Sequence, residues 1–345
     1  MENMGKIQIA GLFPDEIAAW LADYDTASYR ADQIFRWIHH QQVNEFVEMS
    51  NIPNKVIELL ETQCHQPLAV QEVVTRKSID GTEKYLFRLE DHETIETVLI
   101  PDGNRNTVCV SSQVGCAMNC SFCATGQGGC VRNMTGAEIV SQVLWVQRRL
   151  KRENSSISNI VFMGMGEPFA NYREVMKSIH LINHPDGLNL GMRRITISTC
   201  GLVPQIERFA RENTQANLAV SLHAPINSKR SQIMPINKKY PIERLIDACS
   251  YYVEQTGRRI SFEYALIDGF NDSTEDALQL RDLLSDLLCH VNLIPINPVN
   301  HLRRSKSQVI QTFAQVLEDA HISVTIRKER GTDIEAACGQ LRQRS

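Results

Sequence analysis

The sequence contains no apolar run long enough to cross a membrane. No window approaches the roughly 18 consecutive apolar residues that a transmembrane helix requires. Met1 to Ala10 include no apolar stretch of signal-peptide length, and Asp15 and Glu16 follow soon after. Internal repeats, low-complexity tracts and long linkers are also missing. We therefore expect a globular, cytoplasmic protein that makes no contact with a membrane.

The chain also lacks the positive net charge that is typical of nucleic-acid-binding proteins. Its formal net charge is −4, with 36 Lys and Arg residues against 40 Asp and Glu residues. Basic residues do gather locally, but any single group of this kind is usually just a solvated surface. Charge therefore neither establishes nor excludes RNA binding. The groups are Arg148, Arg149, Lys151 and Arg152; Lys238 and Lys239; Arg303, Arg304 and Lys306; and Arg327, Lys328 and Arg330.

Cysteine, in contrast, is abundant, with ten residues in a chain of 345. In a reducing compartment, clustered cysteines bind metal or take part in chemistry more often than they form structural disulfides. Four of the ten, Cys116, Cys120, Cys123 and Cys130, fall within fifteen residues. This clustering predicts a metal or redox site near the middle of the chain.

The first third of the chain changes from a helical to a strand-like pattern. Residues 1–66 are predicted to form a small helical domain, in which Tyr29–His40 carries apolar side chains at helical spacing. Residues 67–105 are predicted to form a β extension, with a hairpin turn at Asp80-Gly81. Its strand-like runs are Leu68–Val74, Lys84–Leu89 and Ile95–Ile100.

Residues 106–345 alternate between strand-like and helix-like segments. Repeated βα units of this kind predict a parallel sheet, either doubly wound or rolled into a barrel. Barrels place their chemistry at the C-terminal ends of the strands, where the unusual residues of this sequence fall. We therefore predict an α/β fold with a partial (β/α)6 barrel. The predicted strands are Thr107–Val110, Ile160–Met163, Arg194–Ser198, Leu218–Leu222, Ile260–Leu266, Val291–Ile296 and Ile322–Ile326, and the predicted helices are Ala137–Arg149, Tyr172–Ile182, Ile242–Glu254, Glu275–Leu288 and Ser307–Ala320.

The central motif is a CxxxCxxC formed by Cys116, Cys120 and Cys123, after the first predicted barrel strand. Three closely spaced thiolates can bind three irons of a [4Fe–4S] cluster, which leaves the fourth iron free to bind a substrate. Structural zinc is the alternative, but it prefers four ligands, commonly from two pairs. Here Cys130 would have to serve as the fourth ligand, so the spacing favours the cluster.

With Phe122 before its last cysteine, this motif resembles that of the radical S-adenosylmethionine superfamily. Further motifs occur in order along the barrel and resemble the RlmN/Cfr family of adenine methyltransferases. Tyr29–Trp37 is similar to the small N-terminal domain of that family. One such motif would be weak, but this many in register make the resemblance specific. The barrel motifs are Val110–Cys116, Phe162–Pro168, Arg193–Thr199, Val220–Pro225, Met234–Pro241, Val291–Pro298 and Asp333–Leu341.

The resemblance implies a [4Fe–4S] cluster on the three cysteines, with S-adenosylmethionine on the open iron and one-electron cleavage to a 5′-deoxyadenosyl radical. It implies that Gly166 and Glu167 contact the amino group of S-adenosylmethionine, because glycine lets a backbone approach a ligand and a carboxylate can accept a hydrogen bond from an ammonium. Taken singly, these residues would fit an ordinary βα turn. The other implied contacts, to the carboxylate, ribose or adenine, are Ser198, Ser221, Leu222, His223 and Asn297.

Three further residues take catalytic roles only through the resemblance. Cys338 is similar to the methyl-carrying cysteine of the family, which one S-adenosylmethionine methylates and a second activates, so two are used per turnover. Cys109 resembles the partner that attacks Cys338, forms a transient disulfide and releases the product. Glu96 matches an acid/base glutamate. Without the resemblance, the apolar strand around Cys109 would place it in the core, and the alternating strand around Glu96 would place it on the solvent-facing side.

The implied activity is methylation of C2 of an adenine in 23S rRNA and in a subset of tRNAs. C8 methylation of the same rRNA adenine, which confers antibiotic resistance, shares the cysteines; Pro168 favours C2, since alanine stands there in the C8 enzymes. A non-catalytic, zinc-bearing RNA-binding protein is the alternative of another class.

The resemblance also implies an external one-electron reductant such as flavodoxin, and we expect the protein to be a monomer.

Overall fold

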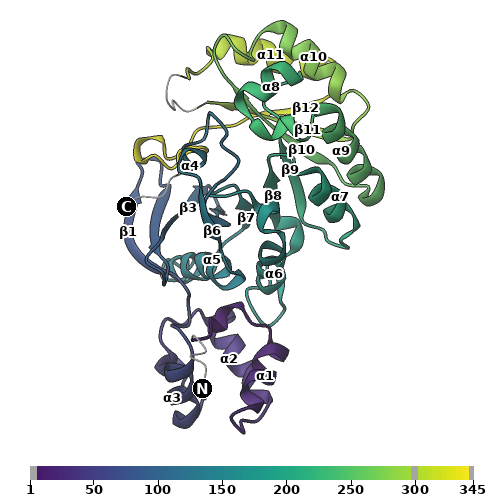
Figure 1. Ribbon diagram of the computed structural model, residues 1–345. Helices are drawn as coiled ribbons and strands as arrows, with labels where there is room; N and C mark the ends of the chain where they lie inside the picture. Colours follow the sequence, from purple (N-terminus) through teal and green to yellow (C-terminus); the bar gives the residue numbers. More distant parts are fainter. Residues whose placement is uncertain (1–5, 297–301, 342–345) are drawn as a thin grey trace.

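The computed structural model describes residues 6–296 and 302–341. The N-terminal helices lie below the larger α/β part of the chain in the view of Figure 1. Pro14 occupies the first turn of the first helix, where its missing N–H costs no hydrogen bond. The helices are α1 (Pro14–Ala22), α2 (Tyr29–Arg36) and α3 (Asn54–Gln63), with a π-helical turn at Trp37–Gln41 and short 3-10 turns at Ile9–Gly11 and Phe46–Glu48.

Polar contacts fasten this helical part to the α/β part. The Arg36 guanidinium lies 2.6 Å from the Asp186 carboxylate, and the Lys151 ammonium donates to the His40 carbonyl at 2.7 Å. Arg148, from the same basic group as Lys151, pairs with Glu48. This group of basic residues therefore serves, in part, to join the two parts of the chain.

The β extension is confirmed as three antiparallel strands that continue the barrel sheet. They are β1 (Gln71–Lys77), β2 (Glu83–Arg88) and β3 (Thr94–Asp102), and β3 pairs with the first barrel strand, β4 (Arg105–Cys109). The predicted turn lies between β1 and β2, where Gly81 adopts a φ of 88° that glycine tolerates best.

All seven predicted barrel strands are present, and all run parallel, which confirms the α/β fold with a partial barrel. After β4 come β7 (Asn159–Phe162), β8 (Ile195–Thr199), β9 (Asn217–Ser221), β10 (Ile260–Leu266), β11 (Cys289–Pro295) and β12 (Ser323–Ile326). The sheet order is linear from β1 to β12. Among the described residues, β4 and β12, the first and last of the parallel strands, therefore do not pair with each other, and the barrel is open between them.

Helices cover the outside of this sheet (Figure 1). The five predicted barrel helices are confirmed, although α10 ends at Leu284, before the predicted Leu288; α7 and α8 were not predicted because both are short. The helices are α5 (Gly136–Lys151), α6 (Tyr172–Asn183), α7 (Val203–Arg211), α8 (Asn227–Ile233), α9 (Ile242–Thr256), α10 (Thr274–Leu284) and α11 (Ser307–Asp319), with 3-10 turns at Pro168–Asn171, Met192–Arg194, Pro235–Lys238 and Thr332–Ile334.

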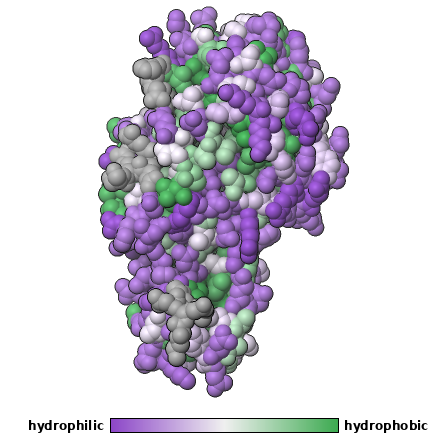
Figure 2. All heavy atoms as spheres, viewed as in Figure 1, coloured by the Kyte–Doolittle hydropathy of each residue, from purple (hydrophilic) through white to green (hydrophobic). Residues whose placement is uncertain are grey.

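Most of the face seen in Figure 2 is hydrophilic, with apolar side chains showing in the middle of its wider part. Across residues 6–296 and 302–341, no helix has the length and apolar content needed to cross a membrane.

The cysteine motif has a small sheet of its own. Strand β5 (Gln113–Gly115) precedes Cys116, and β6 (Cys130–Asn133) returns antiparallel to it, with the short helix α4 (Ala124–Gln127) between them. The sequence predicts the motif at the end of the first barrel strand. The structure instead inserts this two-stranded sheet, which closes the cysteine loop at its base.

A buried amide ties α5 to the strands beneath it. Gln142 is fully buried, and its Oε1 accepts hydrogen bonds from the Thr97 hydroxyl at 2.7 Å and the Ser111 N–H at 2.9 Å. Its Nε2 donates to the Ser111 carbonyl at 2.9 Å. These bonds fix the segment after β4, which leads directly into the cysteine loop.

We predict that Gln142→Leu lowers the free energy of unfolding by about 2–4 kcal/mol, because it leaves two buried donors without an acceptor. The midpoint of urea denaturation measures the change. Gln315→Leu is the matched control, since Gln315 is exposed on α11 and its side chain donates to the exposed Asp319 carboxylate at 2.7 Å. Equal midpoints for the two variants would contradict the prediction.

Candidate active site

A cavity of about 160 Å³ lies at the C-terminal ends of the barrel strands. It gathers residues that are far apart in the sequence, from the cysteine loop, from the ends of β7 to β10 and from the C-terminal segment. Of the residues predicted to bind the cluster or S-adenosylmethionine, those that line the cavity are Cys116, Cys120, Cys123, Gly166, Glu167, Ser198, Ser221 and His223, and Cys338 joins them.

The three cysteines of the motif open into this cavity from one loop. Cys116 is buried, and burial raises the pKa of its thiol to about 12; burial also raises the pKa of the Cys120 thiol. Thiolates here therefore need a neutralising positive charge, such as that of iron. Cys130 begins β6 and does not line the cavity, so the three-cysteine set that the spacing predicted is the one that the fold presents.

This donor set fits a [4Fe–4S] cluster, in which each thiolate binds a different iron and one iron has no protein ligand. Among the residues that the structure describes, no three His, Cys, Asp or Glu side chains are arranged to hold a single metal ion. A second observation fits a ligand beside the cluster. The Glu263 Oε2 atom is buried and has no hydrogen-bond partner within the described ranges, and Glu263 lines the same cavity.

The glycines of the GMGEP motif serve packing as well as the cavity. A Cβ on Gly164 would lie 2.6 Å from the Val110 carbonyl oxygen, and one on Gly166 would lie 2.6 Å from the Gln113 side chain. Gly166 also has a φ of 100°. The sequence suggested that these glycines let the backbone approach a ligand. The structure shows in addition that Gly164 and Gly166 let the turn after β7 pack closely against residues 110–113, which precede the cysteine loop.

Glu167 is buried at the end of that turn and organises the neighbouring backbone. Its Oε2 accepts a hydrogen bond from the Cys200 N–H at 2.7 Å, and its Oε1 accepts one from the Phe169 N–H at 3.0 Å. Burial raises the pKa of the Glu167 carboxyl, and these hydrogen bonds oppose the rise. The carboxylate is thus held in place by the strand end that also carries Ser198 and Cys200.

His223 is buried, and burial lowers its pKa to about 3, so the ring is neutral at ordinary pH. Its Nδ1 accepts a hydrogen bond from the Ala265 N–H at 2.9 Å, which leaves Nε2 as the protonated nitrogen. The ring and Phe122 of the cysteine loop meet edge to face, with centroids 4.6 Å apart. His223 therefore presents a single N–H donor and a flat face.

One residue predicted to contact S-adenosylmethionine does not line the cavity, and another is not among the described residues. Leu222 is fully buried in the core and does not line the cavity, so its side chain packs rather than points inward. Its carbonyl accepts a hydrogen bond from the Arg230 Nε at 3.1 Å. Asn297 lies outside the described residues.

Arg230 was not predicted from the sequence, and it is fully buried behind the cavity wall. Its guanidinium donates to the carbonyls of Cys200 at 2.8 Å and Ser221 at 3.1 Å, which join the ends of β8 and β9. Burial lowers its pKa to about 10. Cys200, Glu263 and Arg327, which line the cavity, were also not predicted to belong to the site. No local motif marks these residues; only their position at strand ends could have suggested them.

A second cavity, of about 420 Å³, lies in the opening of the barrel between β4 and β12. Cys109 at the end of β4 and Cys338 both line it, so the structure brings the two predicted partners to one space. Burial raises the pKa of Cys109 to about 12, and a charge on Cys338 would add to this rise. Cys338 and Arg327 line both this cavity and the one that holds the cysteine motif.

Glu96 lies on β3 and lines neither cavity. It is buried and forms an ion pair of 3.1 Å with Lys84, which is buried as well. The Lys84 ammonium also donates to the Glu335 carbonyl at 2.9 Å, three residues before Cys338. Glu96 is therefore linked through Lys84 to the segment that carries Cys338.

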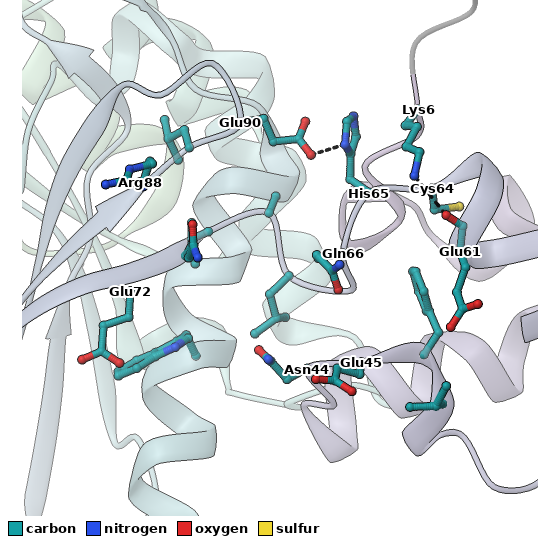
Figure 3. Close-up of a pocket in the computed structure, with 18 residues that line it drawn as sticks. Lys6, Asn44, Glu45, Glu61, Cys64, His65, Gln66, Glu72, Arg88 and Glu90 are labelled. Atoms are coloured by element: carbon teal, nitrogen blue, oxygen red, sulfur yellow. Dashed lines mark hydrogen bonds and ion pairs between the residues drawn. The ribbon is translucent and has the colours of Figure 1, made fainter.

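A larger hollow, of about 850 Å³, lies between the N-terminal helices and the β extension (Figure 3). Its labelled side chains mix both signs of charge, and Glu90 forms an ion pair with His65 across one edge. None of the residues predicted to be catalytic or to bind a cofactor lines it. We therefore assign the chemistry to the two smaller cavities.

Comparison with known proteins agrees with this geometry. The model of the radical SAM superfamily matches residues 110–281, and that of the ribosomal RNA large subunit methyltransferase N-terminal domain matches residues 7–65. A crystal structure of a radical SAM methyltransferase from Sphaerobacter thermophilus superimposes with a TM-score of 0.94 and 47% identity, covering 96% of this chain and 98% of that one.

Curated relatives match along nearly their whole length. A protein of Geobacillus kaustophilus is 47% identical over 97% of this chain and 92% of its own, and one of Thermoanaerobacter sp. is 48% identical over 96% of each. Both carry the name "Probable dual-specificity RNA methyltransferase RlmN". The chain therefore belongs to the RlmN family of radical SAM RNA methyltransferases.

Proposed function

We propose that this protein methylates C2 of adenine 2503 in 23S rRNA and of an adenine in a subset of tRNAs. The observation that carries the proposal is the place of Cys338 in the wall between two cavities. One cavity holds the cysteine motif and the residues predicted to bind S-adenosylmethionine. The other opens beside Cys109 at the gap in the barrel. A cysteine in this wall can receive a methyl group on one side and deliver it on the other.

Cys338 takes the methyl group on its Sγ from one S-adenosylmethionine by ordinary displacement, so a second S-adenosylmethionine is needed in each turnover. When bound, the cluster and this second molecule supply the one-electron chemistry that activates the methyl group. The neighbouring Arg327 guanidinium is within hydrogen-bonding reach of Cys338 and faces both cavities. Such a cation can donate a hydrogen bond to the Cys338 Sγ and so hold it in a fixed orientation between the two cavities.

Cys109 resolves the bond that then joins Cys338 to the base. Its thiolate attacks the Cys338 Sγ, the S–S bond forms and the S–C bond breaks, and the electron pair of that bond together with a proton completes the methyl group. We assign to Glu96 the proton that the methylated ring carbon loses; because Glu96 is buried against Lys84 and lines neither cavity, the bound base must displace that ion pair to reach it. The disulfide must be reduced before the next turnover, so an external reductant is required.

The proposed substrates rest on the relatives rather than on a charged surface. The relatives bear a name that includes dual specificity and RNA, and the N-terminal helices match a domain of ribosomal RNA methyltransferases. An adenine must leave its stack to reach a cavity of this kind, which costs a few kcal/mol. The gap between β4 and β12 is the opening that we assign to the flipped base.

The product identifies the reaction. Anaerobically reconstituted protein is incubated with unmodified 23S rRNA, S-adenosylmethionine and a one-electron reductant, and the digested RNA is analysed by mass spectrometry against standards. We expect 2-methyladenosine. The 8-methyl isomer would overturn the assignment to C2, and the absence of any methyladenosine from a cluster-loaded preparation would overturn the assignment of the substrate.

Removal of Cys109 is expected to trap the intermediate. Cys109→Ala should accumulate RNA covalently bound to Cys338, visible as a slower band on a denaturing gel that nuclease treatment removes, with product formation at least about a hundredfold slower, because the resolving thiolate is gone. Cys249→Ala is the control, since Cys249 is fully buried and lines neither cavity. Product release at the normal rate from Cys109→Ala would assign resolution to another group.

The resolving step is expected to accelerate with pH. Only the thiolate of Cys109 attacks, and with a pKa raised to about 12 by burial its thiolate fraction grows tenfold per pH unit across the neutral range. Between pH 7 and pH 9 the decay of the covalent intermediate in single-turnover experiments should thus become about a hundredfold faster. A decay rate that stays constant across this interval would mean that Cys109 is already ionised or is not the nucleophile.

A further inference from the structure

Glu263 is a buried carboxylate in which only one of the two oxygens accepts a hydrogen bond from the described part of the chain. Its side chain lines the 160 Å³ cavity, and only 4% of the residue is exposed. The Oε1 atom accepts a hydrogen bond from the Asn292 Nδ2 at 2.9 Å. The Oε2 atom has no such partner among residues 6–296 and 302–341. Leaving a buried acceptor of this kind unpaired is costly, so the site is built for a donor that comes from outside the chain.

The surroundings of Glu263 hold its carboxylate in a fixed position. Glu263 pairs in register with Ser221 on β9 and with Asn292 on β11, so the three residues form one rung across the sheet. Asn292 is itself bound by the His290 Nε2 at 3.0 Å, which fixes its amide. Burial raises the pKa of Glu263, while the Arg327 guanidinium and the bond from Asn292 oppose that rise.

The sheet order indicates which part of S-adenosylmethionine this rung meets. The Gly166–Glu167 turn follows β7, whereas β10 lies three strands beyond β7 in the sheet. The resemblance assigns the amino group of the cofactor to the Gly166–Glu167 turn, so the rung, three strands away, faces the nucleoside end. The ribose offers two neighbouring hydroxyl donors, and a carboxylate is the acceptor that binds such donors most strongly.

We propose that Glu263 binds S-adenosylmethionine, its Oε2 accepting a hydrogen bond from a ribose hydroxyl. The inference rests on the proposed use of S-adenosylmethionine in this cavity and deepens it by naming a residue and the group that it contacts. Asn292 acts as a positioning residue, since it holds the other carboxylate oxygen.

The test uses binding rather than turnover. Equilibrium dialysis of cluster-loaded protein measures the Kd of 5′-methylthioadenosine, which keeps the nucleoside but lacks the amino acid, and of its 2′,3′-dideoxy analogue. Glu263→Gln should raise the Kd of methylthioadenosine about tenfold, because a charge-assisted hydrogen bond becomes a neutral one. For the dideoxy analogue, which has no hydroxyl to donate, the variant and the unmodified protein should bind equally.

Asp276→Asn is the matched control, because Asp276 is also buried but pairs with Lys229 and does not line the cavity. Glu263→Asp, which withdraws the carboxylate by one methylene, is the second variant and should also weaken methylthioadenosine alone. An equal loss for both ligands, or no loss for either, overturns the role of Glu263 and leaves the methyltransferase assignment standing. Failure of the unmodified protein to bind S-adenosylhomocysteine would instead overturn the proposed use of the cavity itself.

Discussion

The position of Cys338 depends on hydrogen bonds made by other parts of the chain, because residues 331–341 contain only a single 3-10 turn of their own. The turn between β1 and β2 binds one end of this segment, where the Asp80 carboxylate accepts from the Gly331 N–H at 2.8 Å. The cysteine loop binds the other end, where the Ala124 N–H donates to the Gly339 carbonyl at 2.7 Å. A segment held at both ends keeps Cys338 at the wall between the two cavities without a helix or strand to support it.

The same segment explains why a β extension is attached to the barrel. Lys84 of β2 reaches both the Glu96 carboxylate and the Glu335 carbonyl in a buried position. A buried ion pair of this kind adds little net stability, because desolvation offsets most of the attraction, but it tolerates few other arrangements. The ion pair therefore contributes geometry more than stability, since it fixes the proposed acid/base residue relative to the segment that carries Cys338.

The cavity beside the cysteine loop depends on close backbone packing. Gly164 and Gly166 let the turn after β7 lie against residues 110–113, and Arg230 joins the carbonyls at the ends of β8 and β9. Parallel strands bring their C-terminal ends to one edge, and these contacts hold that edge together. One Glu263 carboxylate oxygen has no partner within the described part of the chain, and the surrounding strands leave the side chain little freedom to move away.

The sequence by itself determined the local structure and the chemistry of the cysteine motif. The alternation of strand-like and helix-like segments predicted all seven parallel strands, and the spacing of Cys116, Cys120 and Cys123 singled out three cysteines that share one cavity. These features are local, so short stretches of sequence contain them. Only the tertiary structure placed Cys109 beside Cys338, buried Glu96 against Lys84, turned Leu222 into the core and brought Glu263 to the cavity. Those positions depend on sheet order and on contacts between residues far apart in the chain, which no local pattern records.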